Sequence, residues 1–244
     1  MNQVLQIKDL HVAVVKKPII KGLNLSLGKS QLHILMGPNG SGKSTLTYAL
    51  MGHPSYEITQ GEIWLNQVNL LPLKVYERAR IGLLLAFQNP LSIPGITLSN
   101  LLRTAFIEIY GKEAMSIIEF HKLMQTKAKL LDLDPILLKR GINDGFSGGE
   151  KKKAEMLQIL LLRPQVAIFD EIDTGLDVDA LKIVSYGINL LQKEGVCILL
   201  ITHYQRILNY LKPDRVHIIM NGVIKTEGGF ALAKQIEKKG YTYV

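Results

Sequence analysis

Long apolar runs and cysteines are scarce in this sequence of 244 residues. The apolar runs at 159–162 and 197–201 end in polar residues well before the roughly 18 residues that a membrane-spanning helix needs. The single cysteine, Cys197, excludes an intramolecular disulfide, and residues 1–10 lack the charged and apolar regions of a secretory signal. We therefore expect a cytoplasmic location without direct membrane insertion, so that any role at a membrane requires a partner.

Acidic residues are in the minority, with 21 Asp and Glu against 29 Lys and Arg and a formal net charge of +8. This balance suits a nucleic acid, an anionic membrane surface or a polyanionic ligand, and equally a solvated basic surface. The lysines are spread along the chain, and no basic run interleaves with aromatic residues as in a platform for single strands. Charge alone identifies no partner, and we expect no nucleic acid.

Short β-branched runs alternate with helical patterns, which predicts an α/β fold with a mainly parallel sheet covered by helices. Three nearly continuous apolar runs are typical of strands buried on both faces: 32–36, 166–169 and 197–201. Further strands are expected at 4–10, 62–65 and 216–220, the first two as an antiparallel portion at one side. Because ligands bind beyond the carboxyl ends of strands in open α/β sheets, a site is expected where these strands end.

A helical segment interrupts this α/β pattern. Residues 97–144 contain no comparable buried strand, show helical patterns, and break at Pro135 and Gly141. We expect a single domain over 1–244, in which 1–96 and 145–244 form the core and 97–144 an inserted helical subdomain. Apolar residues at 181, 184, 188 and 191 predict another helix, with Asp177 at or near its N-cap.

The strand at 32–36 runs into the pattern G-x-x-x-x-G-K-[ST], and a helical run follows. The glycines let backbone N–H groups turn inward around phosphate oxygens, and the helix N-terminus adds partial positive charge. Lys43 reaches the β- and γ-phosphates, and the Ser44 hydroxyl can bind Mg²⁺. A nucleoside triphosphate is therefore expected at Gly37, Pro38, Asn39, Gly40, Ser41, Gly42, Lys43, Ser44 and Thr45.

A phosphate loop alone leaves kinases, GTPases and motor ATPases open, so a second element has to discriminate. The strand at 166–169 delivers Asp170 to its carboxyl end, where the carboxylate can hold Mg²⁺ through water. The adjacent Glu171 can polarise the attacking water as a general base. This carboxylate pair favours a nucleotide-hydrolysing site.

A second anion site is expected at the start of a helix that runs to about residue 162. Phe146, Ser147, Gly148, Gly149 and Glu150 resemble the L-S-G-G-Q signature of the ATP-binding-cassette (ABC) ATPases, with Phe for Leu and Glu for Gln. Neither departure removes the donors of the Ser-Gly-Gly unit. The resemblance implies a P-loop NTPase of the ABC type that hydrolyses ATP with Mg²⁺. It also implies an ATP-dependent homodimer, in which the signature of one subunit covers the ATP held by the other.

Other positions of the ABC pattern follow in family order. Gln88, after the apolar run at 81–87, matches the glutamine that touches Mg²⁺ or the attacking water and couples to partners. Asp177 matches the aspartate that contacts the other subunit, and His203 matches the histidine that contacts the γ-phosphate. The resemblance thus implies catalytic roles for Lys43, Gln88, Glu171 and His203, and metal contacts for Ser44, Gln88 and Asp170.

One family feature is missing, because Val14 stands where many ABC ATPases place an aromatic residue that stacks on adenine. Such stacking contributes roughly 1 to 3 kcal/mol per base. We therefore expect the base to be held by apolar contact alone, with weaker affinity and a looser preference for ATP over GTP.

Several segments outside these motifs are more specific: GHPSYEIT (52–59), ERARIG (77–82), LAFQNP (85–90), IPG (93–95), THYQR (202–206) and PDRVH (213–217). They resemble SufC, the ABC-type ATPase family of the SUF iron–sulfur cluster assembly system, and the resemblance runs from Leu5 to Tyr241. It implies SufB and SufD as partners, in a complex with two copies of this chain whose ATP-dependent closure rearranges SufB–SufD. The chain itself should carry no cluster, because clusters are generally held by four Cys or a His/Cys mixture and this chain has a single cysteine.

Two other functions stay open at this point. One is a transporter ATPase that docks on membrane helices, and the other is a nucleotide-gated assembly module with negligible turnover. The intact set of Lys43, Asp170, Glu171 and His203 argues against the latter. The basic run at 151–153 is interpreted as a solvated helix face, or as the source of a lysine that pairs with an acidic residue near the site.

Overall fold

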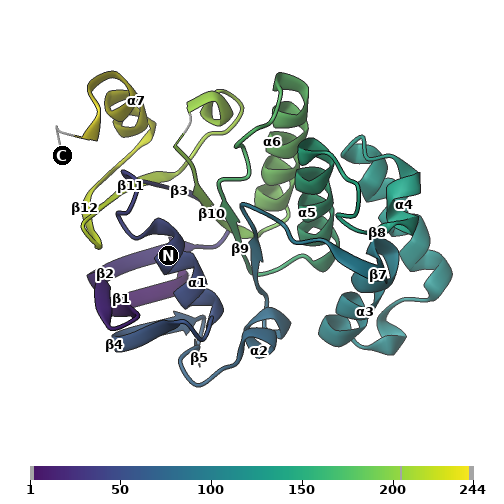
Figure 1. The fold of residues 1–244 in the computed structure, drawn as a ribbon, viewed down its shortest axis with the longest axis horizontal. Helices are drawn as coiled ribbons and strands as arrows, with labels where there is room; N and C mark the ends of the chain where they lie inside the picture. The colour runs from purple at the N-terminus through teal and green to yellow at the C-terminus, as the bar shows by residue number, and fades with distance from the viewer. Residues whose placement is uncertain (1–2, 204, 242–244) are drawn as a thin grey trace.

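A six-stranded sheet forms the centre of the molecule (Figure 1), in the order β12 (Val223–Gly228), β11 (Arg215–Met220), β3 (Leu32–Met36), β10 (Cys197–Ile201), β9 (Val166–Asp170) and β6 (Leu83–Ala86). The computed structural model describes residues 3–203 and 205–241, so Tyr204 of the segment 202–206 lies outside the described residues. Neighbouring strands are parallel except β12, which is antiparallel to β11. The strands expected at 32–36, 166–169, 197–201 and 216–220 are confirmed.

A second, antiparallel sheet has the order β2 (Lys17–Gly28), β1 (Gln3–Val14), β4 (Tyr56–Leu65) and β5 (Val68–Asn69). Leu5 pairs with Leu65 and Ile7 with Ile63, which confirms the antiparallel portion expected from 4–10 and 62–65. Sequence reasoning missed β2, although its buried residues 23, 25 and 27 alternate with exposed ones as in a half-buried strand.

The central sheet is buried on both faces. Ile198 and Leu200 of β10 belong to the apolar cluster shared with helices α5 (Gly148–Leu162) and α6 (Val178–Lys193). Cys197 and Leu199 belong to the cluster shared with α1 (Lys43–Met51) and the antiparallel sheet. This double burial is why the strands are continuously apolar.

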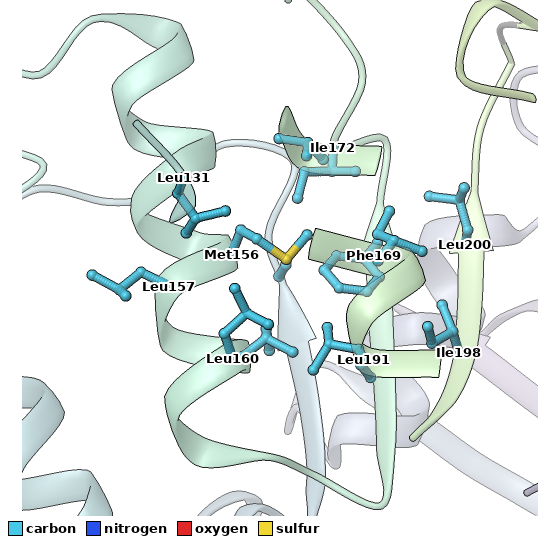
Figure 2. Close-up of a cluster of buried hydrophobic side chains, with 14 of the residues drawn as sticks. Leu131, Met156, Leu157, Leu160, Phe169, Ile172, Leu191, Ile198 and Leu200 are labelled. Carbon is cyan, nitrogen blue, oxygen red and sulfur yellow. The ribbon is translucent and has the colours of Figure 1, made fainter. Parts of the chain in front are cut away.

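Helix α5 is anchored in the core on more than one side (Figure 2). Met156, Leu157 and Leu160 are at most 1% exposed and lie in the cluster that contains Phe169 of β9 and Leu131, which follows helix α4 (Ile117–Leu130). Burying side chains of this size contributes about 1.5 to 3 kcal/mol each. The helix is therefore held firmly against the sheet.

A helical segment lies beside α5 in Figure 1. It contains α3 (Leu98–Tyr110), η1 (Lys112–Ala114), α4 and η2 (Pro135–Lys139), all without a buried strand, as expected. Two short strands that were not predicted, β7 (Ile93–Thr97) and β8 (Gly141–Ile142), pair antiparallel at its ends. This pairing brings the two ends of the segment together, so that the segment forms an insertion.

The remaining elements lie at the periphery: α2 (Val75–Arg80), η3 (Gln205–Asn209) and α7 (Phe230–Lys239). No helix in the described ranges is long and apolar enough to cross a membrane. The fold is thus α/β, with a mainly parallel core, an antiparallel portion and an inserted helical subdomain.

Candidate functional site

The loop at 37–42 joins β3 to α1 and encloses its own lysine. Lys43 Nζ donates hydrogen bonds to the carbonyl oxygens of Gly37 (2.9 Å) and Pro38 (3.0 Å). Burial lowers the pKa of Lys43, and the negative charges of Glu171 and Asp170 oppose that shift. The ammonium group therefore lies between the carbonyls of the loop and carboxylates that come from a different strand.

Two glycines of this loop are required by close approaches. A Cβ at Gly37 would lie 2.2 Å from the carbonyl oxygen of Ile219, and one at Gly42, where φ is +109°, would lie 2.7 Å from Ile20 Cδ1. Ile219 belongs to β11 and Ile20 to β2, so both sheets press on the loop. The loop conformation is thus set by packing as well as by its own sequence.

The other loop residues leave an opening. Asn39 and Gly40 are exposed, and a Cβ at Gly40 would meet nothing within 4 Å. Ser41 Oγ is buried and has no hydrogen-bond partner among the described residues. Ser44 presents an exposed hydroxyl in the first turn of α1, next to Thr45. A buried hydroxyl without a partner beside an open helix N-terminus suits an anionic ligand.

Asp170 ends β9 beside α1. Thr47 Oγ1 donates to Asp170 Oδ2 (3.3 Å), whereas Oδ1 is buried without a partner among the described residues. Burial raises the pKa of Asp170, and the charge of Glu171 raises it further. A buried carboxylate oxygen with no donor is costly unless a cation approaches it, so this side chain and Ser44 fit Mg²⁺.

Three residues far apart in the sequence, Gln88, Glu171 and His203, lie in contact. Gln88 Nε2 donates to Glu171 Oε2 (2.6 Å), and His203 Nε2 lies 3.0 Å from Glu171 Oε1. Gln88 follows β6, Glu171 follows β9 and His203 follows β10, so the carboxyl ends of three parallel strands deliver them. Burial and the charge of Lys43 lower the pKa of His203, which keeps the imidazole neutral near pH 7 despite the opposing effect of Glu171.

Glu171 has a left-handed backbone, with φ at +49°. Its N–H donates to the carbonyl oxygen of Ile201 (3.0 Å), which ties the turn after β9 to the end of β10. A non-glycine residue in this region is uncommon, and the hydrogen bond to Ile201 holds the turn in place. The turn aims the carboxylate toward Gln88 and His203.

The Ser147-Gly148-Gly149 unit opens α5. Ser147 is the N-cap: its N–H donates to Glu150 Oε2 (2.7 Å), and the Glu150 N–H donates to Ser147 Oγ (3.3 Å). These bonds lower the pKa of Glu150. The spacing S-x-x-E could have predicted this capping box. Among the described residues no hydrogen bond or ion pair joins the unit to the phosphate loop.

Asp177 caps α6, with Oδ1 accepting from the Ala180 N–H (2.7 Å), as predicted. Sequence reasoning missed Asp173, which is 1% exposed and accepts a hydrogen bond from Thr202 Oγ1 (2.6 Å). Burial raises the pKa of Asp173. This bond joins the segment after β9 to the residue that precedes His203.

The basic run at 151–153 is only partly a solvated face, which corrects the simpler interpretation. Lys153 Nζ donates to the carbonyl oxygen of Asp132 (2.8 Å) at the surface, whereas Lys152 is 5% exposed and donates to the carbonyl oxygens of Phe87 (3.2 Å) and Gln88. The alternative, that one of these lysines pairs with an acidic residue near the site, is supported in part. The hydrogen-bond acceptors of Lys152 are backbone oxygens, but the negative charges of Glu155, Asp170, Asp173 and Glu171 oppose the lowering of its pKa by burial.

Val14 ends β1 and is half-buried, and the turn that follows places Val15 and Lys16 at φ values of +48° and +63°. Val15 is 92% exposed. No aromatic side chain is supplied by this turn, in keeping with the sequence.

Comparison with known proteins assigns the family. The profile described as ABC transporter matches residues 20–174. The chain belongs to the ABC transporter family. As an ABC ATPase it binds ATP and hydrolyses it, and the P-loop NTPase fold predicted from the motifs is confirmed.

Curated relatives cover nearly the whole ABC chain. Vegetative protein 296 of Bacillus subtilis is 48% identical over 98% of this chain and 92% of its own length. A probable ABC transporter ATP-binding protein of Streptococcus pyogenes is 48% identical, covering 98% of this chain and 93% of its own. The probable ATP-dependent transporter ycf16 of Cyanophora paradoxa is 45% identical over 100% of this chain and 95% of its own.

Solved structures share the fold at lower identity. The structure of an ATP-binding subunit of an ABC transporter superposes with a TM-score of 0.80 at 24% identity and covers 98% of this chain and 96% of its own. A dimeric bacterial ABC transporter cassette gives a TM-score of 0.79 at 21% identity and covers 92% and 98%.

Proposed function

We propose that this ABC ATPase hydrolyses Mg-ATP at a site built from two copies of the chain, and that the cycle drives SufB–SufD in SUF iron–sulfur cluster assembly. The observation that carries the hydrolytic part is the meeting of Gln88 and His203 on Glu171, at 2.6 and 3.0 Å. A carboxylate held from two sides is positioned to orient a water molecule.

In the proposed reaction Glu171 accepts the proton of the attacking water, and Gln88 orients that water. Each oxygen of the Glu171 carboxylate has two lone pairs, so both can accept a water proton without losing Gln88. The neutral His203 moves from Glu171 to the γ-phosphate, and Lys43 exchanges its loop carbonyls for phosphate oxygens. Once they contact the phosphate oxygens, these donors stabilise the charge of the transition state, which provides most of the catalysis in phosphoryl transfer.

Three residues are proposed to contact Mg²⁺: Ser44, Asp170 and Gln88. The unpaired Oδ1 of Asp170 supports this choice. When bound, Mg²⁺ neutralises the charge on the phosphate oxygens.

The second half of each site comes from another copy of the chain. Ser147, Gly148 and Gly149 form an anion site that has no connection to the phosphate loop of their own chain among the described residues, and Asp177 would contact the other subunit. A solved cassette with this fold is named as a dimer, and another is named as a dimeric post-hydrolysis state bound to ADP and phosphate. These names support a head-to-tail ATP sandwich for this chain.

Residues 97–144 are proposed to act as a helical subdomain, and 1–96 with 145–244 as the nucleotide-binding core. The antiparallel pair of β7 and β8 at the ends of the insertion supports this division. Leu131 of the subdomain and Met156 of α5 belong to the same buried cluster (Figure 2). Movement of the subdomain would therefore displace the helix that begins after Ser147.

The assignment to SUF assembly is supported by the segments outside the shared ABC motifs, from GHPSYEIT to PDRVH. It places the chain in the cytoplasm, in a complex of two copies with SufB and SufD. A second candidate is the ATPase subunit of a membrane transporter, which is favoured by the names of the Streptococcus and Cyanophora relatives.

Purification of a tagged chain from its native host, followed by mass spectrometry, separates the two candidates. The expected result is recovery of SufB and SufD, each in a molar amount of about half that of the tagged chain. Recovery of a protein with several membrane spans, without SufB or SufD, would instead establish the transporter subunit.

A further inference from the structure

Two buried charged side chains of α5 hold the backbone that carries Gln88. Lys152 Nζ donates to the carbonyl oxygens of Phe87 (3.2 Å) and Gln88, and Glu155 Oε2 accepts from the Phe87 N–H (3.1 Å). Gln158 Nε2, one turn further on, donates to Glu155 Oε1 (3.0 Å) and orients that carboxylate. One turn of α5 thus binds three polar groups of the backbone after β6: the N–H and C=O of Phe87 and the C=O of Gln88. We call Lys152 and Glu155 the α5 latch.

The α5 latch replaces a missing sheet ladder. Strand β6 ends at Ala86, so the N–H and C=O groups of Phe87 lie beyond the ladder and need other partners. The Phe87 ring is 43% exposed, which means that burial of the ring does not fix this backbone. Hydrogen bonds from the latch provide the fixation, and those donated by the Lys152 ammonium are charge-assisted and therefore about twice as strong as neutral ones.

Keeping these charges inside the protein has a cost. Lys152 is 5% and Glu155 7% exposed. Burial lowers the pKa of Lys152 and raises the pKa of Glu155 to about 7. An apolar pair would pack at these positions without this penalty, although it would leave the backbone of Phe87 unbound.

The backbone held by the latch carries the amide that touches Glu171. Gln88 Nε2 lies 2.6 Å from Glu171 Oε2. The supporting helix does not move easily, because Met156 and Leu160 face Phe169, and Leu157 is buried on the opposite side of the helix (Figure 2). Its N-terminus is Ser147. A single anchored helix therefore connects the Ser147 end with the backbone of Gln88.

We propose that Lys152 and Glu155 are positioning residues of the ATPase, which lock the Phe87–Gln88 backbone to α5 and thereby set the Gln88 amide against Glu171. This inference rests on the catalytic roles proposed for Gln88 and Glu171.

Steady-state ATP hydrolysis of the full chain tests the latch with Lys152→Met, Glu155→Leu, Glu155→Gln, Gln88→Ala and the control Lys153→Met. Lys153→Met is matched to Lys152→Met because it removes the same charge from the same helix, at a lysine that binds Asp132 at the surface. Hydrogen exchange of the peptide that contains Phe87 and Gln88 is measured in parallel, since the latch protects the Phe87 N–H.

Lys152→Met and Glu155→Leu should lower kcat at least about tenfold while KM for ATP stays within about threefold, because the phosphate loop is untouched and only transition-state positioning is lost. In Glu155→Gln the new amide oxygen can still accept from the Phe87 N–H. The Gln158 amide then has to rotate by 180° so that its oxygen accepts from the new NH₂ group. The kcat of this variant should therefore lie within about threefold of wild type. Exchange of the Phe87 peptide should accelerate in the first two variants and stay unchanged in Lys153→Met.

Normal kcat in Lys152→Met and Glu155→Leu, together with a low kcat in Gln88→Ala, would overturn the latch and leave the proposed function intact. Normal kcat in Gln88→Ala would overturn both, because the latch would then have no catalytic group to position. A kcat loss in Lys153→Met equal to that in Lys152→Met would also overturn the latch, since any lysine on the helix would then have the same effect. If Glu155→Leu fails to fold, the comparison of Lys152→Met with Lys153→Met decides.

Discussion

Glu171→Gln removes one negative charge from a side chain that is 15% exposed and lies against Gln88 and His203. The amide oxygen can still accept from Gln88 Nε2, and the new NH₂ group faces a neutral imidazole that can accept from it, so the geometry should survive. What is lost is the general base, which contributes about 10² to 10⁴ in rate, or about 2.7 to 5.5 kcal/mol in the barrier. Asp170 loses a like-charged neighbour that raises its pKa, so Mg-ATP binding should be retained or tightened.

Single-turnover hydrolysis of ATP measures the rate, and light scattering measures the mass of Glu171→Gln with and without ATP. We expect slow hydrolysis and an ATP-dependent species of twice the monomer mass. Adding Ser147→Arg should return this species to monomer, because Ser147 of one chain would cap the nucleotide held by the other. A rate within tenfold of wild type would refute the general base. A monomer in both conditions, at ATP concentrations well above its dissociation constant, would refute the dimeric site.

Five further outcomes are expected. Lys43→Ala should abolish binding of a fluorescent ATP analogue, because the loop loses its cation; unchanged binding would refute the phosphate site. GTP or ITP should be hydrolysed within about tenfold of ATP, since Val14 offers no stacking platform, and a hundredfold preference for ATP would show that another contact reads adenine. Burial raises the pKa of Cys197 to about 12, so its thiol should resist thiol reagents in the native chain. Anaerobic reconstitution should leave the chain without iron or sulfide, and Cys197→Ser should keep its ATPase activity; stoichiometric iron with cluster absorbance would contradict this. Burial raises the pKa of Glu155 from 4.5 to about 7, so the folded state binds more protons than the unfolded state between these values. Wild type should therefore gain about 3 kcal/mol in unfolding free energy relative to Glu155→Gln as the pH falls from 8 to 4.5, in urea titrations, whereas a constant difference would contradict the raised pKa.

The sequence by itself determined the features whose cause is local. The strands at 32–36 and 197–201 are continuously apolar because both faces are buried. Such runs predict a buried strand even when the elements that cover it are unknown. The phosphate loop is legible because a tight turn that presents N–H groups needs glycine at particular steps. Asp177 could be placed at the start of α6 because a cap requires only a short polar side chain before an amphipathic run.

Only the tertiary structure decided the contacts between distant segments. Residues 151–153 are polar on a helix, so the sequence favours solvation, yet Lys152 is buried because the backbone after β6 passes over α5. Glu155 and Asp173 were missed for the same reason, since nothing in their own segments shows which unpaired backbone or hydroxyl group they will meet. Gln88 and His203 could be named singly from the family pattern, but their contact with Glu171 depends on the order of β6, β9 and β10 in the sheet. A local sequence pattern predicts the backbone conformation of its own segment. The position of a buried charge depends instead on a hydrogen-bonding partner that lies elsewhere in the chain.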